Sequence, residues 1–209
     1  MYTKNELHLR LIAPDTGGLA PVITDDARML LAAEGDMRAF SEIVSSNERT
    51  IRRFCFGMLG NRAVADEAAQ DTFLKLWQER ERYRPCNKFR AYLFSIAKNR
   101  CISLLRRRAV VSFMGLDSLL HEPASPLEGE AFGNSRSERD ERDAIIRAAV
   151  QRLPSKLRVA VILRFIEDMG YDEIATVIGR SASAARSRVH YGLRALAGSL
   201  PEEVRTWND

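Results

Sequence analysis

Basic and aromatic side chains alternate through residues 89–108. Tyr92 and Phe94 lie among the basic residues, and Tyr83 and Phe89 flank the loop before them. The basic residues are Arg90, Lys98, Arg100, Arg106, Arg107 and Arg108. Lysine and arginine bind phosphate groups, and aromatic rings can stack on unpaired bases. The stretch therefore predicts a surface for strand-separated DNA, although Phe94 is expected in the core.

A second basic surface is predicted near the C-terminus. Gly179 suits the left-handed turn that ends a helix, and Ser181 is a good N-cap for the next one. A helix, a short turn with glycine and a second helix form the helix-turn-helix pattern. The helical period places four positions of the second helix against the core, namely Ala185, Val189, Gly192 and Leu196.

The other side of this second helix is expected to face solvent. Its polar and basic residues are Ser183, Arg186, Ser187, Arg188, His190, Tyr191 and Arg194. Such side chains fit a DNA major groove, where arginine donates to guanine or to phosphates. A helical hairpin within a bundle that binds no DNA would give the same pattern.

A third candidate surface is acidic. In the helix predicted near residues 64–80, an apolar stripe is formed by Ala69, Phe73, Leu76 and Trp77. The other side carries Asp66, Glu67, Gln70, Asp71 and Leu74. An acidic face with one exposed leucine suits docking on a basic partner, and an ordinary solvated helix face is the alternative.

Residues with catalytic or metal-binding spacing do not stand out. Three cysteines and three histidines are scattered along the chain: Cys55, Cys86, Cys101, His8, His121 and His190. Zinc signatures place ligands in close pairs, and an odd, scattered set of cysteines argues against a disulfide framework. No Walker-type glycine loop is present. We therefore expect no metal, no cofactor and no enzymatic activity.

The elements that would position these surfaces are all predicted to be helical. Apolar residues recur at spacings of three and four, and no alternating segment indicates a strand. The expected helices cover residues 27–33, 37–59, 64–80, 89–108, 143–152, 154–170, 171–178 and 182–197. The predicted fold class is all-α, with two small helical domains joined by a flexible linker.

Composition divides the chain into five parts. They are an N-terminal arm (1–24), a first domain (25–108), a linker (109–140), a second domain (141–200) and a C-terminal tail (201–209). The linker has two prolines, several glycines and serines, and weak periodicity. Its apolar patch at residues 110–120 fits either docking on a partner or a short turn of helix.

Charge is unevenly distributed over the 209 residues, whose net charge is +4. Acidic residues gather at 66–81 and 128–141, and basic ones at 98–108 and 180–194, which favours polyanionic partners. No apolar run approaches the roughly 18–20 residues of a membrane helix. The N-terminus lacks the apolar core of a signal peptide. We therefore expect a cytoplasmic protein without stable membrane insertion.

The segment DEAAQDTFLKLW at residues 66–77 resembles the most characteristic part of sigma-70 factors of the extracytoplasmic-function group. Residues 89–108 resemble the same group. Region 4 of this group is resembled by four further segments: Leu153-Pro154, residues 158–165, YDEIA at 171–175 and RSRV at 186–189. The resemblance covers about residues 27–108 and 141–200, in the family's order.

This resemblance implies a transcription initiation factor with three partners: core RNA polymerase, promoter DNA and an anti-sigma factor. The acidic face (Asp66, Glu67, Gln70, Asp71 and Leu74) would bind the clamp coiled coil of polymerase. The helix at 89–108 and its preceding loop would read the minus-ten element and capture a flipped base. Base contacts are expected from Asn87, Lys88, Lys98 and Asn99. Phosphate contacts are expected from Arg100, Arg106, Arg107 and Arg108.

The second domain would read the minus-thirty-five element, but its recognition helix departs from the family pattern. Many members have Pro or Gly followed by Thr-Val near its start, where this chain has SASAA at residues 181–185. Two other functions stay open. One is a simple helix-turn-helix regulator, and the other is a sigma mimic that titrates an anti-sigma factor.

Overall fold

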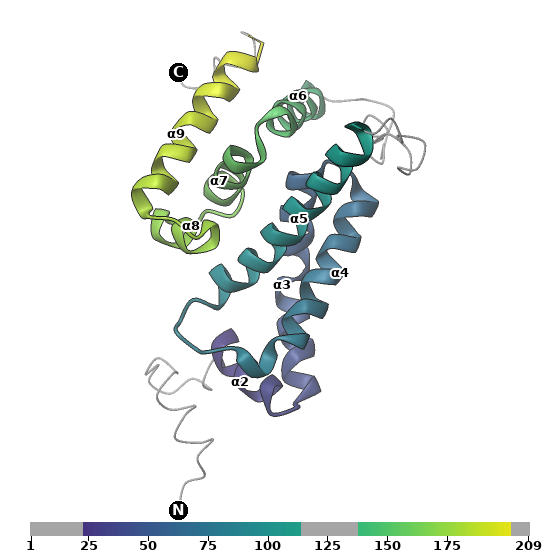
Figure 1. The fold of residues 1–209 in the computed structure, drawn as a ribbon, viewed down its shortest axis with the longest axis vertical. Helices are drawn as coiled ribbons and strands as arrows, with labels where there is room; N and C mark the ends of the chain where they lie inside the picture. Colours follow the sequence, from purple (N-terminus) through teal and green to yellow (C-terminus); the bar gives the residue numbers. More distant parts are fainter. Residues whose placement is uncertain (1–22, 114–137, 202–209) are drawn as a thin grey trace, which may run out of the picture.

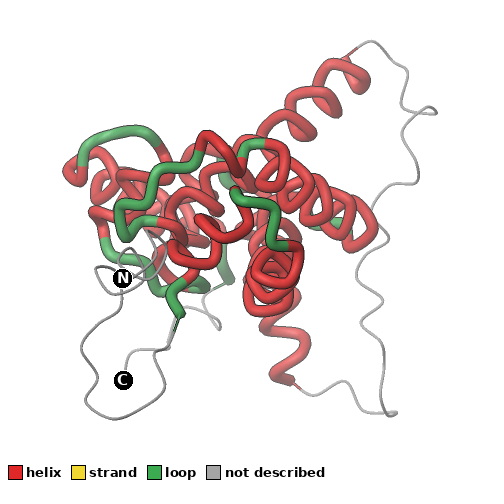
Figure 2. The backbone as a smooth tube through the Cα atoms, turned by 90° about the horizontal axis from the view of Figure 1, so that it is seen from below, coloured by secondary structure: helices red, strands yellow, loops and turns green. Residues whose placement is uncertain are grey.

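Helices are the regular elements of the residues that the structure describes. This structure, a computed structural model, describes residues 23–113 and 138–201. These two ranges contain eight α-helices, one short 3-10 helix and no strand (Figure 1, Figure 2). The prediction of an all-α fold is confirmed. The predicted arm up to residue 22, linker residues 114–137 and the tail from residue 202 lie outside the described residues.

The first domain is built from four α-helices. They are α2 (Asp25–Ala33), α3 (Met37–Leu59), α4 (Arg62–Gln78) and α5 (Phe89–Phe113), and the 3-10 helix η1 (Arg80–Arg82) follows α4. Asp36 caps the start of α3 by accepting hydrogen bonds from two backbone N–H groups. Gly60 ends α3 in the left-handed conformation, with φ of 73°. Both ends of α3 lie where the sequence predicts them.

The second domain contains the remaining helices. They are α6 (Glu138–Arg152), α7 (Ser155–Phe165), α8 (Tyr171–Ile178) and α9 (Ala182–Ser199). Gly179 follows α8 with φ of 62°, and the Ser181 side chain caps α9 by accepting from Ala184 N–H at 3.2 Å. The predicted helix-turn-helix of α8 and α9 is therefore present.

Three helix ends differ from the predicted ones by five residues, and the others lie within two residues of the prediction. α7 ends at Phe165 rather than near residue 170, because Asp168 adopts a left-handed φ of 48° and interrupts the helix. α5 continues beyond residue 108, and α6 begins before residue 143. Neither extension contains proline or glycine, so nothing in its sequence stops the helix. The helices therefore extend into both ends of the predicted linker.

The hydrophobic cores of the two domains are continuous. α3 packs against α6 and α7, and α5 packs against α8 (Figure 1). One cluster of buried residues includes Phe54 and Phe94 of the first domain and Ile162 and Ile174 of the second. At the crossing of α3 and α7, a Cβ added to Gly57 would lie 3.1 Å from Ile162 Cδ1. The sequence predicts two domains but carries no signal for this contact between them.

Polar side chains also connect the domains. Arg158 of α7 donates to the Met58 carbonyl at 2.5 Å, at the end of α3 where carbonyls lack partners within the helix. Glu167 follows α7, and its fully buried carboxylate pairs with Arg53 of α3 at 2.8 Å. A buried charge is stable only when it is paired, so this ion pair ties the second domain to α3.

Candidate nucleic-acid and partner interfaces

The predicted acidic surface lies along α4. Ala69, Phe73 and Leu76 are buried, and the Trp77 ring packs on Phe40 with centroids 4.9 Å apart, as the apolar stripe requires. The opposite side carries the five predicted docking residues, Asp66, Glu67, Gln70, Asp71 and Leu74. Leu74 is 56% exposed, so its apolar side chain is open to solvent on this face. The side chains therefore lie where the helical period predicts them, and their binding role stays a prediction.

Arginines from neighbouring helices pair with this acidic face. Arg100 of α5 contacts Asp71 at 2.5 Å and Glu67 at 3.2 Å. Arg52 of α3 contacts Asp66 at 2.8 Å, and this hydrogen bond holds the pKa of Asp66 below its usual value. The sequence assigned Arg100 to DNA phosphates, but its guanidinium is paired with carboxylates in this structure. Arg100 therefore belongs geometrically to the α4 face.

A shallow groove separates α4 from α5 beside Leu74. Its volume is about 470 Å³. The lining residues are Asp71, Leu74, Lys75, Gln78, Glu79, Ile96, Asn99 and Arg100. Asn99, assigned to minus-ten bases from the sequence, thus opens into the same groove as Leu74. The groove combines an exposed apolar side chain with charges of both signs, which suits a helix of a partner protein.

The loop between η1 and α5 carries two further predicted DNA contacts. Asn87 and Lys88 are exposed, and Asn87 adopts a left-handed φ of 54°. Tyr83 and Phe89, which flank the loop, are 7% and 3% exposed and pack edge-to-face. These two rings hold the loop against the domain and are not available to stack on bases. Phe94 is buried as predicted.

The N-terminal half of α5 is partly covered by the second domain. Lys98 Nζ donates to the Val177 carbonyl of α8 at 2.8 Å. Burial, and to a lesser extent the nearby Arg188, lowers the pKa of Lys98. Arg90 donates to the Glu167 carbonyl and lies 4.0 Å from the Glu173 carboxylate. The predicted contact of Lys98 with a base therefore requires α8 to move away.

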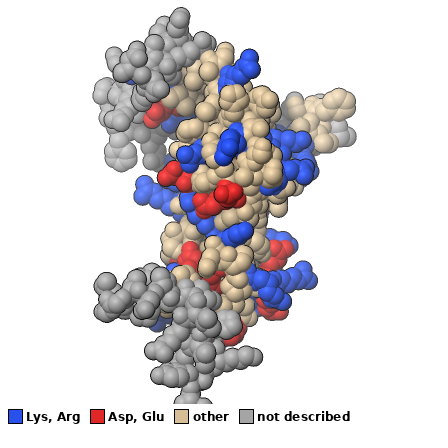
Figure 3. Space-filling view, turned by 90° about the vertical axis from the view of Figure 1, so that its left-hand side faces the viewer, with Lys and Arg blue, Asp and Glu red and all other residues tan. Residues whose placement is uncertain are grey.

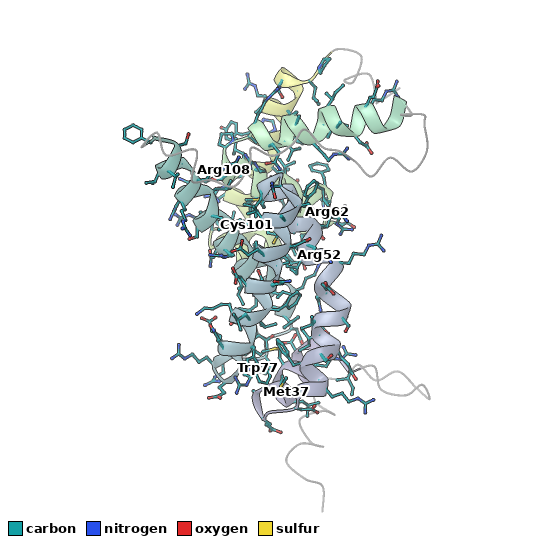
Figure 4. The ribbon with its side chains drawn as sticks, turned by 90° about the vertical axis from the view of Figure 1, so that its right-hand side faces the viewer. Met37, Arg52, Arg62, Trp77, Cys101 and Arg108 are labelled. Atoms are coloured by element: carbon teal, nitrogen blue, oxygen red, sulfur yellow. The ribbon has the colours of Figure 1, made fainter. Side chains whose placement is uncertain are left out.

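The arginines at the end of α5 are not covered in this way. Arg106, Arg107 and Arg108 are all exposed. In Figure 4 the end of α5 that carries Arg108 projects away from the other helices. Their guanidinium groups can reach a phosphate backbone without any change of the fold.

The recognition helix α9 has the predicted inner and outer faces. Ala185, Val189, Gly192 and Leu196 are its buried residues, as the sequence predicts. Six of the predicted DNA-contacting residues are exposed: Ser183, Arg186, Ser187, His190, Tyr191 and Arg194. Arg188 is half-buried on the side that faces α5. Figure 3 looks onto the α8–α9 side of the molecule, where basic side chains are spread over the upper half.

Other binding chemistry would need metal ligands, reactive thiols or a membrane-spanning helix. In the described part of the chain, no three His, Cys, Asp or Glu side chains lie close enough together to hold a metal ion. Cys55 and Cys101 are buried free thiols, and contact with Cys55 together with burial raises the pKa of Cys101. Thiols in such surroundings react poorly. None of the described helices is long and apolar enough to cross a membrane.

These features define a class of protein: an all-helical DNA-binding protein that joins a helix-turn-helix domain to a second basic domain. Comparison with known proteins narrows the class. Residues 43–110 match sigma-70 region 2, and residues 143–196 match sigma-70 region 4. The chain belongs to the sigma-70 family of RNA polymerase sigma factors, in the extracytoplasmic-function group. Its function is that of an alternative sigma factor in transcription initiation.

Individual relatives support this assignment over most of the chain. RNA polymerase sigma factor CarQ of Myxococcus xanthus is 31% identical over 174 residues, which cover 82% of this chain and 96% of CarQ. ECF sigma factor SigE of Mycolicibacterium smegmatis is 29% identical, and the match covers 80% of this chain but 65% of SigE. ECF sigma factor SigW of Bacillus subtilis is 24% identical, with 83% and 95% covered.

Solved structures support the fold. CnrH, solved in complex with the cytosolic domain of CnrY, is 23% identical and gives a TM-score of 0.62, with 83% of this chain and 95% of CnrH covered. RpoE of Bartonella quintana, solved with the anti-sigma factor NepR, is 20% identical and gives a TM-score of 0.64. That match covers 83% of this chain and 100% of RpoE.

Proposed function

We propose that this chain carries core RNA polymerase to promoter DNA by using three separate surfaces. The outer face of α9 binds the minus-thirty-five duplex, the loop before α5 and α5 itself bind the minus-ten element, and the α4 face binds polymerase. The observation that carries the proposal is the clean division of α9, with Ala185 and Val189 buried and Arg186 and His190 exposed. A helix built in this way can enter a major groove without unfolding.

The α4 surface is proposed as the polymerase contact. Leu74 supplies an exposed apolar side chain beside a groove, and Asp66, Glu67 and Asp71 supply negative charge around it. A basic helix of polymerase would compete with Arg52 and Arg100 for these carboxylates. Exposed ion pairs contribute only about 0–1 kcal/mol each, so exchanging one partner for another is energetically easy.

The minus-ten surface is proposed to extend from the loop at residues 83–88 along α5 to Arg108. Asn87 and Lys88 would contact bases, while the exposed arginines from residue 106 onward would hold phosphates. Unstacking a base costs a few kcal/mol, and many weak contacts in the assembled polymerase complex must offset that amount. Lys98 joins this surface only when α8 leaves α5, so promoter opening is proposed to follow separation of the two domains.

A protein partner is also proposed. CnrH and RpoE, which share this fold, were solved with CnrY and with the anti-sigma factor NepR. We infer that an anti-sigma factor binds this chain as well. RNA synthesis itself belongs to polymerase, so the chain is proposed to have no catalytic activity. It would act in the bacterial cytoplasm, where polymerase and promoter DNA are located.

Run-off transcription with purified core polymerase and genomic promoter fragments tests the proposal. Arg186→Ala should weaken binding to minus-thirty-five duplex, and Asp71→Ala should weaken binding to core polymerase, each by about tenfold, or about 1.4 kcal/mol. Both should reduce the specific transcripts. Arg38→Ala and Glu81→Ala are matched controls, because both side chains are exposed and lie outside the three surfaces.

The possible outcomes separate the alternatives. Transcripts that need the chain, weaken in the two site variants and persist in the controls support the proposal. DNA binding without core polymerase and without a new transcript would indicate a simple regulator. A chain that binds neither DNA nor core polymerase would be better explained as a sigma mimic.

A further inference from the structure

A buried carboxylate accepts hydrogen bonds from the loop that precedes α5. Asp26, in the first turn of α2, is only 6% exposed. Its Oδ1 accepts three hydrogen bonds: from the Tyr83 hydroxyl at 2.7 Å, from Cys86 N–H at 3.1 Å and from Asn87 N–H at 3.2 Å. One oxygen therefore holds both the ring at the start of the loop and two consecutive amides at its turn.

The backbone of the loop is shaped around this oxygen. Asn87 adopts a φ of 54°, in the left-handed region that asparagine enters more readily than most non-glycine residues. Consecutive N–H groups next to a left-handed residue converge on one point and form a small anion-binding concavity. Asp26 supplies the anion from within the chain. Without it, the amides of Cys86 and Asn87 would lose their acceptor, and the left-handed turn would lose its support.

The carboxylate is held by a helix that is itself fixed. Met29 and Ala32 of α2 are fully buried, and α2 packs against α3 and η1. Figure 1 shows α2 beside the connection that leads from η1 into α5. The position of Oδ1 is thus set by the core and not by the loop.

The N–H groups of Cys86 and Asn87 point inward, and the side chains at this turn of the loop point outward. Cys86, Asn87 and Lys88 are all exposed, whereas Tyr83 is buried. A side chain on a loop with one fixed conformation recognises a ligand with a smaller loss of entropy than a side chain on a mobile loop. The same fixed conformation also lets it discriminate between ligands of different shape.

We propose that Asp26 is a positioning residue that sets the base preference of the chain at the minus-ten element. This inference rests on the proposed role of the loop in promoter binding. Asp26 touches no DNA, and it acts by holding Asn87 and Lys88 in the arrangement that accepts one base better than the others. Without the carboxylate, the side chains of Asn87 and Lys88 remain, but the loop no longer holds them in one arrangement.

The test compares promoters that differ only in the base at each minus-ten position and share one minus-thirty-five element. Open-complex formation with core polymerase is measured for the original chain, Asp26→Ala, Asp26→Asn and Tyr83→Phe. Asp26→Ala should slow open-complex formation on the preferred promoter by about tenfold. The rates of this variant on promoters that carry the four different bases should lie within about threefold of one another. Asp26→Asn keeps one oxygen acceptor, and Tyr83→Phe removes one donor. The opening rate and base preference of both variants should therefore lie between those of the original chain and those of Asp26→Ala.

Matched controls separate positioning from loss of folding. Asp25→Ala changes the neighbouring carboxylate, which bonds Arg28 and Asn47 instead of the loop, and should leave the base preference intact. Binding of Asp26→Ala to core polymerase and to minus-thirty-five duplex should stay within about twofold of the original. If Asp26→Ala does not fold, Asp26→Asn and Tyr83→Phe decide the question through the same promoter set.

Two results would overturn the inference. One is an unchanged base preference in the Asp26 and Tyr83 variants, and the other is an equal loss on all promoters. Asn87→Ala and Lys88→Ala show which idea has failed. If these variants change the base preference while the Asp26 variants do not, only the positioning role is wrong. If they do not change it either, the proposed role of the loop in promoter binding is wrong.

Discussion

At the scale of single residues, buried polar groups hold the points where helices meet. Arg158 is 8% exposed and donates to the carbonyls of Met58 and Leu153, near the C-terminal ends of α3 and α6. Burial lowers the pKa of Arg158, because a charge is disfavoured away from water. The carbonyls at helix ends carry partial negative charge, which offsets this penalty. One side chain therefore joins three helices from two domains.

Tyr92 gives a residue-scale prediction about alkaline pH. Its hydroxyl donates to Glu79 at 3.1 Å, and burial, followed by that hydrogen bond, raises the pKa of Tyr92 to about 12. An unfolded tyrosine titrates near pH 10. The folded chain holds this proton more tightly, so the stabilisation is complete below about pH 10 and is lost as pH rises toward 12.

Urea unfolding at pH 9, 10 and 11 checks this expectation. The free energy of unfolding should fall with pH, and the fall should be smaller in Tyr92→Phe, which has no proton to lose at this position. A variant with the same pH dependence as the original chain would show that Tyr92 does not contribute to it.

At the scale of elements, the recognition helix depends on close packing against α7. Gly192 lies where α9 crosses α7, and a Cβ at this position would overlap Val161 Cγ2. Gly198, further along the same helix, has no atom within 4 Å of an added Cβ. The orientation of α9, and with it the direction of its outer face, therefore depends on the absence of a side chain at Gly192.

Gly192→Ala and Gly198→Ala should consequently have different effects on stability. Overpacking costs about 1–3 kcal/mol, and replacing glycine by alanine in a helix returns up to about 1 kcal/mol. Gly192→Ala should lower the free energy of unfolding by about 1 kcal/mol and weaken minus-thirty-five binding. Gly198→Ala should leave stability equal or slightly higher. Urea unfolding followed by circular dichroism measures both, and a Gly192→Ala chain of unchanged stability would contradict the packing argument.

At the scale of the whole molecule, the two domains pack together, and the second domain covers part of α5 in the first. α8 lies against α5, Lys98 is bonded to the Val177 carbonyl, and the buried Glu167 is paired with Arg53. The ion pair has one fully buried and one half-exposed partner, so its strength lies between those of buried and surface pairs. The promoter binding proposed for the whole α5 surface would need the contacts of α8 with α5 to break.

Glu167→Gln should therefore shift the chain toward separated domains. Removing the charge takes away the ion pair at the domain boundary, an effect of about 1–2 kcal/mol. Small-angle X-ray scattering should show a larger radius of gyration, and single-stranded minus-ten DNA should bind more tightly. Asp168→Asn is the matched control. The Asp168 side chain is 97% exposed, and its ion pair is with Arg164 of α7, in the same domain, at 3.7 Å. Unchanged scattering in Glu167→Gln would mean that this pair does not hold the domains together.

The sequence by itself determined the helices and their inner and outer faces. The helical period placed Ala185, Val189 and Leu196 on the inner face of α9 and identified the apolar stripe of α4. The structure confirms both placements. Gly60 and Gly179 marked helix ends correctly because their left-handed conformation is a local preference. These features depend on residues a few positions apart, which is the range over which periodicity and capping act.

Only the tertiary structure decided which surfaces are free and which are paired. Arg100 bonds to Asp71, Lys98 to the Val177 carbonyl and Asp26 to Asn87, across separations of 29, 79 and 61 residues. Such contacts depend on how helices pack, and packing is set by the shape and volume of the complete core. A pattern along the chain can therefore place a side chain on a face of its own helix. It cannot show which other helix covers that face.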